Sequence, residues 1–268
     1  MTLGLGFAEL TLTYELNSEG YRDREFERSG ATAAGRVIML GDSFTFGQGV
    51  PVDETLPRVT EALLRARGET GARVWNIGRQ GWNTRAQVDA YLKLGARVRH
   101  SPVVLVYTYN DIDLRSFGPR DPRLLWFMQK WRTGHLIASA FHGYVDPTYA
   151  SYWETTERAY RSSDSAEWQQ VSTAIAELRD ACRANGADLM IYYYELLAEG
   201  TDARRWLAHE KVKALAATLE VPFRSFPPLP KDTDLRAWYV HSLDPHPNGM
   251  AHHRAAAVIV DYLATRRR

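Results

Sequence analysis

Short, dense runs of apolar residues alternate along the chain with longer segments in which apolar residues recur every three or four positions. The runs have the length of strands buried on both faces, and the longer segments have the spacing of helices that bury one side. The predicted strands are residues 37–40, 74–77, 103–107, 188–193 and 221–223. The predicted helices are residues 55–67, 85–98, 166–184, 204–219 and 251–265. This alternation predicts an α/β fold in which a mostly parallel, five-stranded sheet lies between two layers of helices.

The helix predicted over residues 85–98 shows how the pattern assigns a buried face. Thr84 directly precedes it and has the hydroxyl that an N-cap needs. The apolar residues of this segment recur at helical spacing, which predicts which of them face the core. They are Val88, Tyr91, Leu92 and Ala96.

Two segments depart from the alternation. Residues 1–34 are weakly patterned and then polar, and we expect an N-terminal arm packed against the main domain. Residues 112–164 hold many aromatic side chains between short helical pieces, which predicts an insertion after the third strand. This insertion is either a subsidiary core under long loops or a lid over a binding site. No linker or repeat divides the chain, so residues 1–268 are expected to form one domain.

Composition and charge exclude several classes of function. Apolar residues make up 45% of the chain and charged residues 24%, as in an ordinary globular protein. The net charge is +1, so no overall field attracts nucleic acid or an anionic membrane, and no amphipathic segment indicates stable membrane insertion. The single cysteine, Cys182, excludes an intrachain disulfide and a CxxC metal site, and its helical context predicts a small buried residue.

Small and polar residues follow three of the predicted strands. Gly41-Asp42-Ser43 follows the first strand, Gly81 lies in the loop after the second, and Asn110 follows the third. Because the carboxyl ends of parallel strands form one edge, where ligands bind in open α/β sheets, we expect these residues to meet. A serine hydroxyl at this edge can act as a nucleophile, and N–H groups beside it can stabilise an oxyanion.

A further candidate motif, Ser242-Leu243-Asp244-Pro245-His246, precedes the last predicted helix. A serine hydroxyl needs a base at neutral pH, and an imidazole needs an acceptor on its other nitrogen to fix its tautomer. His246 is the candidate base and Asp244 the candidate orienting group. The prolines on either side of His246 restrict the backbone that carries both side chains.

Taken in order, these motifs resemble the sequence blocks of the SGNH/GDSL hydrolases, and the resemblance covers roughly residues 35–265. It implies a flavodoxin-like three-layer α/β/α sandwich and acyl transfer through a seryl ester. Ser43 would be the nucleophile, and Asp244 and His246 would complete a catalytic triad. The family most often places the aspartate three residues before the histidine, whereas the spacing here is two. If Asp244 does not reach the imidazole, a Ser-His dyad would remain.

The same resemblance assigns an oxyanion hole to the backbone N–H groups of Ser43 and Gly81 and to the side-chain amide of Asn110. Gly78 is the alternative to Gly81 in the second block. Asp111 follows Asn110 in the family pattern too; we assign it no chemistry and expect it to hold the loop.

A metal site formed by Asp244, His246, His252 and His253 is the competing interpretation of the last motif. His252 and His253 are adjacent on the predicted helix, about 100° apart around its axis, and so they do not readily face one ion. We therefore expect neither a metal nor a cofactor.

The expected function is hydrolysis of small acyl esters, with O-acetyl groups of a carbohydrate or natural product as the favoured substrates. Two alternatives keep the same fold, namely an O-acyltransferase that uses the same Ser-His-Asp site and a catalytically silent binding module. The apolar run at residues 3–8 is too short for an export signal, so the chain as it stands is expected in the cytoplasm. Residues 4–23 also resemble the region after a membrane anchor in some bacterial SGNH proteins, and such an anchor would place the chain outside the cytoplasm.

Overall fold

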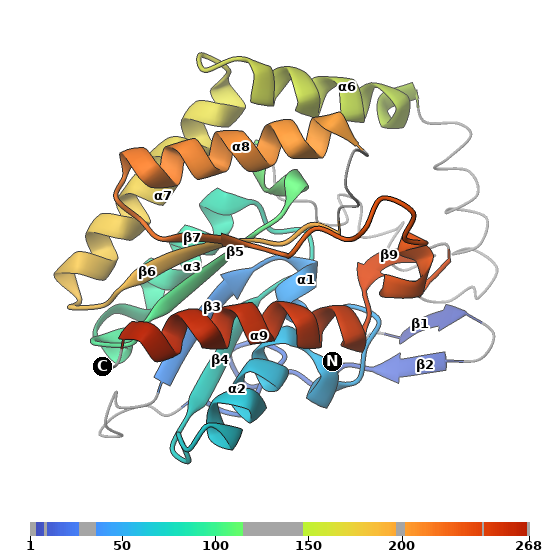
Figure 1. Ribbon diagram of the computed structural model, residues 1–268. Helices are drawn as coiled ribbons and strands as arrows, with labels where there is room; N and C mark the ends of the chain where they lie inside the picture. The colour runs from blue at the N-terminus through green and yellow to red at the C-terminus, as the bar shows by residue number, and fades with distance from the viewer. Residues whose placement is uncertain are drawn as a thin grey trace.

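A parallel sheet forms the centre of the protein. The computed structural model describes residues 4–7, 10–26, 36–114, 147–196, 202–242 and 244–266. In this part of the chain, five strands lie in the order β4-β3-β5-β6-β7 (Figure 1). They are β3 (Arg36–Gly41), β4 (Arg73–Gly78), β5 (Val103–Tyr107), β6 (Leu189–Tyr193) and β7 (Phe223–Ser225). Numbered within the sheet, this order is 2-1-3-4-5, which is flavodoxin-like, and the predicted fold class is confirmed.

The first strand of the sheet, β3, is buried along its whole length. It pairs with β4 on one side and β5 on the other. Its alternate residues enter the two cores, with Ile38 and Leu40 on one face and Val37 and Met39 on the other. A strand buried on both faces reads as a continuous apolar run, which is why the sequence pattern located it.

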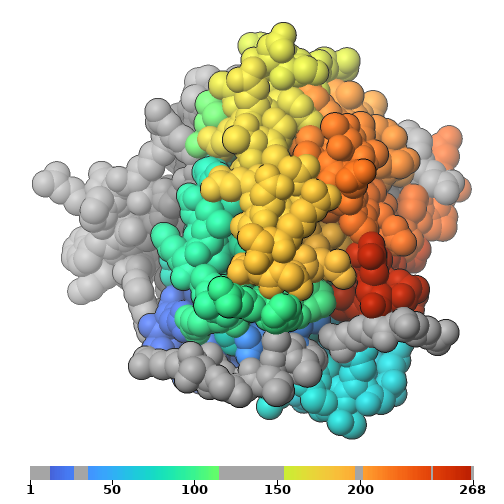
Figure 2. Space-filling view, turned by 90° about the vertical axis from the view of Figure 1, so that its left-hand side faces the viewer, coloured from blue at the N-terminus to red at the C-terminus, as the bar shows by residue number. Residues whose placement is uncertain are grey.

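Helices cover both faces of the sheet (Figure 1). One layer contains α2 (Leu56–Ala66) and α9 (Gly249–Arg266), which pack against each other. The other contains α3 (Thr84–Leu94), α7 (Ala166–Ala184) and α8 (Ala203–Thr218), with α6 (Pro147–Arg161) packed against α7 and α8. In Figure 2 the gold surface of α7 lies near the centre of this side, with α6 above it and α8 to its right.

Shorter elements connect the strands and helices of these layers. They are α1 (Ser43–Phe46), the 3-10 turns η1 (Val52–Glu54), η2 (Gly95–Val98), η3 (Tyr109–Ile112) and η4 (Leu235–Trp238), and the antiparallel pair β8 (Tyr239–His241) and β9 (Asp244–Pro247).

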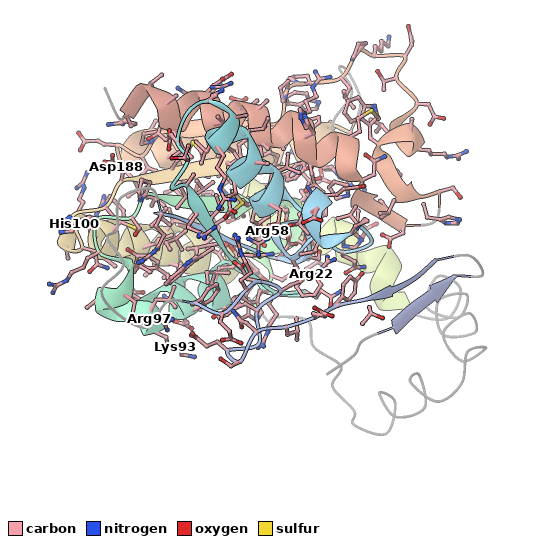
Figure 3. The ribbon with its side chains drawn as sticks, turned by 90° about the horizontal axis from the view of Figure 1, so that it is seen from below. Arg22, Arg58, Lys93, Arg97, His100 and Asp188 are labelled. Carbon is pink, nitrogen blue, oxygen red and sulfur yellow. The ribbon has the colours of Figure 1, made fainter. Side chains whose placement is uncertain are left out.

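The N-terminal region forms a separate hairpin followed by an extended arm. Strands β1 (Gly4–Phe7) and β2 (Leu10–Thr13) pair only with each other among the described strands. The following residues lie against β4 and α2: Asp23 accepts a hydrogen bond from the Asn76 backbone N–H at 2.7 Å and forms an ion pair with Arg58. Phe26 stacks on Trp75 with ring centroids 4.4 Å apart. Figure 3 shows Arg22 of the arm and Arg58 of α2 on the same side of the molecule.

The structure corrects the predicted buried face of α3. Asn83, not Thr84, is the N-cap, and its side chain accepts a hydrogen bond from the Ala86 N–H. The helix ends at Leu94, before η2, whereas the sequence predicted that it would run on to residue 98. Leu92 is 38% exposed, whereas Leu94 is buried with the two correctly predicted residues, Val88 and Tyr91. Ala96, in η2, is exposed.

The last strand of the central sheet, β7, also differs from its prediction, because it begins at Phe223 rather than at residue 221. Much of the predicted insertion, residues 115–146, lies outside the described residues, so the lid prediction stays open. In the described remainder, the Tyr160 hydroxyl of α6 donates to the Tyr109 carbonyl at 2.8 Å and lies 2.8 Å from the Tyr107 hydroxyl. This end of the predicted insertion therefore packs onto the turn that carries Asn110.

Candidate active site

Ser43 lies at the first position of α1, directly beyond the buried strand β3. Asp42 caps this short helix by accepting a hydrogen bond from the Phe44 N–H at 2.9 Å. The helix sits so close to β4 that a Cβ on Gly78 would lie 2.5 Å from the Phe46 nitrogen. Glycine at position 78 therefore allows α1 to pack this close to β4. The tight strand–helix turn holds the Ser43 hydroxyl at the edge of the sheet.

His246 and Asp244 complete a hydrogen-bonded chain with Ser43. The Ser43 Oγ and His246 Nε2 are 2.9 Å apart, and His246 Nδ1 is hydrogen-bonded to Asp244 Oδ1. Both residues belong to β9, and side chains two positions apart on a strand point to the same face. The two-residue spacing therefore brings the carboxylate to the imidazole, and Asp244 reaches its predicted partner.

The surroundings of Asp244 favour its ionised form. Burial by itself raises the pKa of this carboxyl, but hydrogen bonds from His246 and Gln48 lower the pKa below its ordinary value. An ionised carboxylate on Nδ1 keeps Nε2 directed at Ser43 and stabilises the imidazole when it takes up a proton.

Asn110 is fixed at both ends of its side-chain amide. Its Nδ2 donates to Asp42 Oδ2 at 3.3 Å, and its Oδ1 accepts from the Thr108 hydroxyl at 3.0 Å. An amide nitrogen carries two hydrogens, so one N–H remains for a ligand after the bond to Asp42. Asn110 also lines the same cavity as Ser43 and His246.

Asp111 stabilises the turn that presents Asn110. Its carboxylate accepts from the Thr108 N–H at 3.0 Å and from the Gln87 side chain at 2.9 Å. Burial, together with the nearby charge of Asp42, raises its pKa well above the usual range. The pKa of Asp42 is raised by burial as well. These contacts fit the expectation that Asp111 holds the loop.

Gly81 lies in the loop after β4, at the same edge of the sheet, with a φ of 72° that favours glycine. The loop is tied to the nucleophile turn, because the Arg79 N–H donates to the Gly41 carbonyl at 3.3 Å. Gln80 Nε2 also donates to Gln48 Oε1 at 2.8 Å. Gly81 is not among the residues that line the cavity at Ser43, and its role in an oxyanion hole stays a prediction.

A cavity of about 260 Å³ opens beside Ser43, and part of its wall was not anticipated from the sequence. Glu195 is buried, accepts a hydrogen bond from the Tyr109 N–H at 2.6 Å and pairs with Arg205 at 3.2 Å. Tyr239 lines the same wall. The position of Glu195 just beyond the fourth predicted strand was the feature of the sequence that could have marked it as a site residue. A larger hollow, of about 830 Å³, lies between the arm and α2, but none of the proposed catalytic residues lines it.

The alternative metal cluster is not formed. His252 is fully buried and its Nδ1 lies 3.2 Å from the Tyr194 hydroxyl, whereas His253 is exposed. Burial lowers the pKa of His252 to about 3, so this imidazole is neutral. Among the described residues, no group of three or more His, Cys, Asp or Glu side chains is arranged to hold a metal ion.

Comparison with known proteins identifies the class. The model of the GDSL-like lipase/acylhydrolase family matches residues 39–254, and the chain belongs to this family. It is therefore an ester hydrolase of the SGNH/GDSL type. A search of curated protein sequences found no match.

Solved structures agree on the fold. The structure of TesA has 17% sequence identity to this chain and a TM-score of 0.53, covering 86% of this chain and 98% of TesA. The psychrotrophic esterase EstA from Pseudoalteromonas sp. has 11% identity and a TM-score of 0.51, covering 87% and 98%. A structure assigned to the G-D-S-L family of lipolytic proteins, from Desulfitobacterium hafniense, has 12% identity and a TM-score of 0.51, covering 85% and 98%.

No described helix combines the length and the apolar character needed to cross a membrane.

Proposed function

We propose that the chain hydrolyses small acyl esters through a covalent seryl-acyl intermediate, with Ser43 as nucleophile, His246 as base and Asp244 as the orienting group. The observation that carries this proposal is the continuous hydrogen-bonded chain from Ser43 Oγ through the His246 ring to Asp244. A hydroxyl, an imidazole and an ionised carboxylate in this order supply a nucleophile and the base that activates it.

In the first half-reaction, Ser43 Oγ attacks the carbonyl carbon of the ester and its proton passes to His246 Nε2. The negative charge that develops on the carbonyl oxygen is met by the Ser43 N–H, the remaining N–H of Asn110 and the Gly81 N–H. The tetrahedral intermediate then expels the alcohol, which takes the proton from His246. In the second half-reaction, His246 removes a proton from water, the resulting nucleophile attacks the acyl-serine, and Ser43 is released with its proton restored.

The cavity beside Ser43 supports a small acyl group attached to a polar alcohol. Its volume, about 260 Å³, is modest. Its wall combines apolar groups, among them Phe44 and Leu196, with the charged pair Glu195 and Arg205. Burying a long alkyl chain against charged groups gains little, whereas a hydroxylated alcohol can form hydrogen bonds with them. O-acetyl groups on a carbohydrate or natural product fit this description, and they are the substrates we propose.

The test is to label the protein with a fluorophosphonate probe and to measure turnover of p-nitrophenyl acetate. We expect the adduct on Ser43, and we expect Ser43→Ala to lose labelling and at least ~10³-fold in turnover, the size typical of removing a triad member. Ser163→Ala, at an exposed serine, is the matched control. Turnover that survives unchanged in Ser43→Ala would overturn the proposal, and an unlabelled wild type would favour a silent binding module.

The same assay separates hydrolysis from acyl transfer. Adding a sugar or another alcohol as acceptor leaves free acetate as the main product if water is the natural acceptor. Predominant formation of the acylated acceptor at millimolar concentration would instead favour the O-acyltransferase alternative.

A further inference from the structure

The turn that carries Asn110 is held by two side chains from other elements. Tyr109 directly precedes Asn110 in η3, and both of its backbone groups are bonded to these side chains. Its N–H donates to Glu195 at 2.6 Å, and its carbonyl accepts from the Tyr160 hydroxyl at 2.8 Å. Tyr160 belongs to α6, which packs against η3, α7 and α8 (Figure 1). A side chain of α6 therefore fixes the peptide group that joins Tyr109 to Asn110.

Tyr160 is itself held at its hydroxyl, its ring and its backbone. It is 1% exposed, and its hydroxyl lies 2.8 Å from the Tyr107 hydroxyl. A hydroxyl has one hydrogen, and that of Tyr160 goes to the Tyr109 carbonyl, so Tyr107 is the donor to Tyr160. The rings of Tyr160 and Tyr109 pack with centroids 5.2 Å apart, and Lys211 of α8 donates to the Tyr160 carbonyl at 2.6 Å. Tyr160 can therefore hold the Tyr109 carbonyl in one orientation.

The direction of the Asn110 amide depends on the orientation of this turn. Its bond to Asp42 is 3.3 Å long, which is beyond the usual range for an N–H···O bond. Its other bond, to the Thr108 hydroxyl, comes from the residue just before η3 and does not tie the turn to another element. An oxyanion donor must be held within ~0.5 Å of its productive position. Rotation of the Tyr109–Asn110 peptide group would move the amide out of that range.

We propose that Tyr160 is a positioning residue whose hydroxyl fixes the Tyr109–Asn110 peptide group and so directs the Asn110 amide at the oxyanion. Glu195 holds the other side of Tyr109. This inference rests on the proposed function, because it presupposes that Asn110 stabilises the oxyanion formed at Ser43. It gives the described end of the predicted insertion a part in catalysis.

The main experiment is a double-mutant cycle with Tyr160→Phe and Asn110→Ala. Tyr160→Phe removes only the hydroxyl and keeps the packed ring. It is expected to lower kcat for p-nitrophenyl acetate by ~10-fold with little change in KM, about the effect of losing one hydrogen bond that matters in the transition state. In the Asn110→Ala background the same change is expected to cost less than ~2-fold, because residues that act through one another are not additive.

Tyr192→Phe is the matched control. Tyr192 lies in β6 and is fully buried, and its hydroxyl has no hydrogen-bond partner in the part of the chain that the structure describes. The control thus removes the same atom from an equally buried ring without breaking a hydrogen bond. We expect its kcat and KM to match those of the wild type.

The rate of fluorophosphonate labelling gives a readout that a general loss of stability does not move. The phosphoryl oxygen of the reacting probe develops negative charge that the oxyanion donors stabilise. We expect Tyr160→Phe to slow the labelling of Ser43 per active site, and the double variant to label no more slowly than Asn110→Ala. Loss of folded protein alone would lower the labelled fraction at the end point and leave the rate constant unchanged.

Tyr107→Phe keeps the proposal testable if Tyr160→Phe does not fold. It removes the hydroxyl that donates to Tyr160 but leaves the bond between Tyr160 and the Tyr109 carbonyl. We expect kcat to fall by ~3-fold, because the bonds of such a network strengthen one another, and to be unchanged by this substitution when Asn110 is already alanine.

The outcomes separate this inference from the function on which it rests. Full activity of a folded Tyr160→Phe, or equal losses in the wild-type and Asn110→Ala backgrounds, overturns the positioning role while Ser43 labelling stands. For Tyr107→Phe the same two results overturn it. A wild type that neither labels nor turns over ester overturns both the inference and the proposed function.

Discussion

The carboxylates at the edge of the sheet fall into two groups with opposite electrostatic behaviour. Asp42 and Asp111 are almost fully buried behind the ends of β3 and β5, and burial raises the pKa of each. Asp244 lies on the peripheral strand β9 and is partly exposed, and the hydrogen bonds it accepts lower its pKa. All three are aspartates within one site, so the difference comes from their surroundings.

This difference in environment corresponds to two different roles of the carboxylates. The buried pair accepts hydrogen bonds from the backbone of the two turns, including the Phe44 and Thr108 N–H groups, and so keeps Ser43 and Asn110 in place. Asp244 accepts from the imidazole of His246, which we propose as the base. The carboxyl at the edge of the domain is thus the one suited to catalysis, and those in the core are suited to holding the turns.

The largest expected effect falls on Asp244. Asp244→Asn keeps the shape of the side chain but removes its charge and can present a donor to Nδ1, so we expect kcat/KM to fall by ~10³-fold. Steady-state kinetics with p-nitrophenyl acetate measure this. A loss below ~10-fold, with the fold intact by circular dichroism, would mean that a Ser-His dyad suffices.

Asn110→Ala tests the donor held by the buried pair. We expect kcat to fall on the order of 10²-fold with a small change in KM, because an oxyanion donor acts mainly in the transition state. A negligible effect on kcat would remove Asn110 from this role. The Asn248 side chain donates to the Ala237 carbonyl in η4, so Asn248→Ala would disturb other contacts. Gln169→Ala, at an exposed position of α7, is the control instead.

Asp111→Ala is expected to act on stability. It leaves the Thr108 N–H and the Gln87 amide without their acceptor, which should lower the free energy of unfolding by about 2 kcal/mol. Asp111→Asn should cost less, because the Gln87 amide can flip and offer its oxygen to the new donor. Urea unfolding of both variants provides the comparison, and equal losses would contradict the assigned contacts.

The smallest effect concerns the buried imidazole of His252. Its pKa is lowered to about 3 in the folded state from an ordinary 6.5, so the unfolded state binds more protons between these values. The neutral His252 imidazole therefore contributes to the free energy of unfolding above pH 6.5, and this contribution is lost as the pH falls toward 3. Between pH 7.5 and 5.5 the loss of stability is on the order of 1 kcal/mol.

His252→Leu should lose that part of the pH dependence. The raised pKa values of Asp42 and Asp111 act in the opposite direction, because their contribution is lost as pH rises, so the comparison is between wild type and variant at each pH. Urea unfolding at pH 7.5 and 5.5 measures it. Identical pH dependence in the two proteins would show that His252 is not the group responsible.

Much of the fold follows from local pattern. The apolar runs that became β3 and β5 are buried throughout, and α7 begins and ends at the predicted residues. The errors arose where tertiary packing decides the result. Leu92 is exposed although it is apolar, and the α3 stripe passes through Leu94 instead, because the contacts of a helix with its neighbours select the face that is buried.

The sequence by itself determined the chain order of the five sheet strands and of the five long helices between and after them, the hydroxyl after β3, and the presence of an acid and an imidazole near the C-terminus. These are local properties of short segments. A parallel sheet then brings the carboxyl ends of its strands to one edge. Only the tertiary structure decided which of them touch. Ser43 and His246 are 203 residues apart along the chain, and two-residue spacing works for Asp244 because β9 is extended.

The contacts of Gln48, Tyr160 and Glu195 likewise depend on the tertiary structure. Each of these residues is unremarkable in its local pattern, and each gains its part in the site from groups far away in the chain. Hydrogen bonds have a direction and a short range, so periodicity cannot predict them. They are fixed only when α6, the nucleophile turn and the ends of the central strands have packed together.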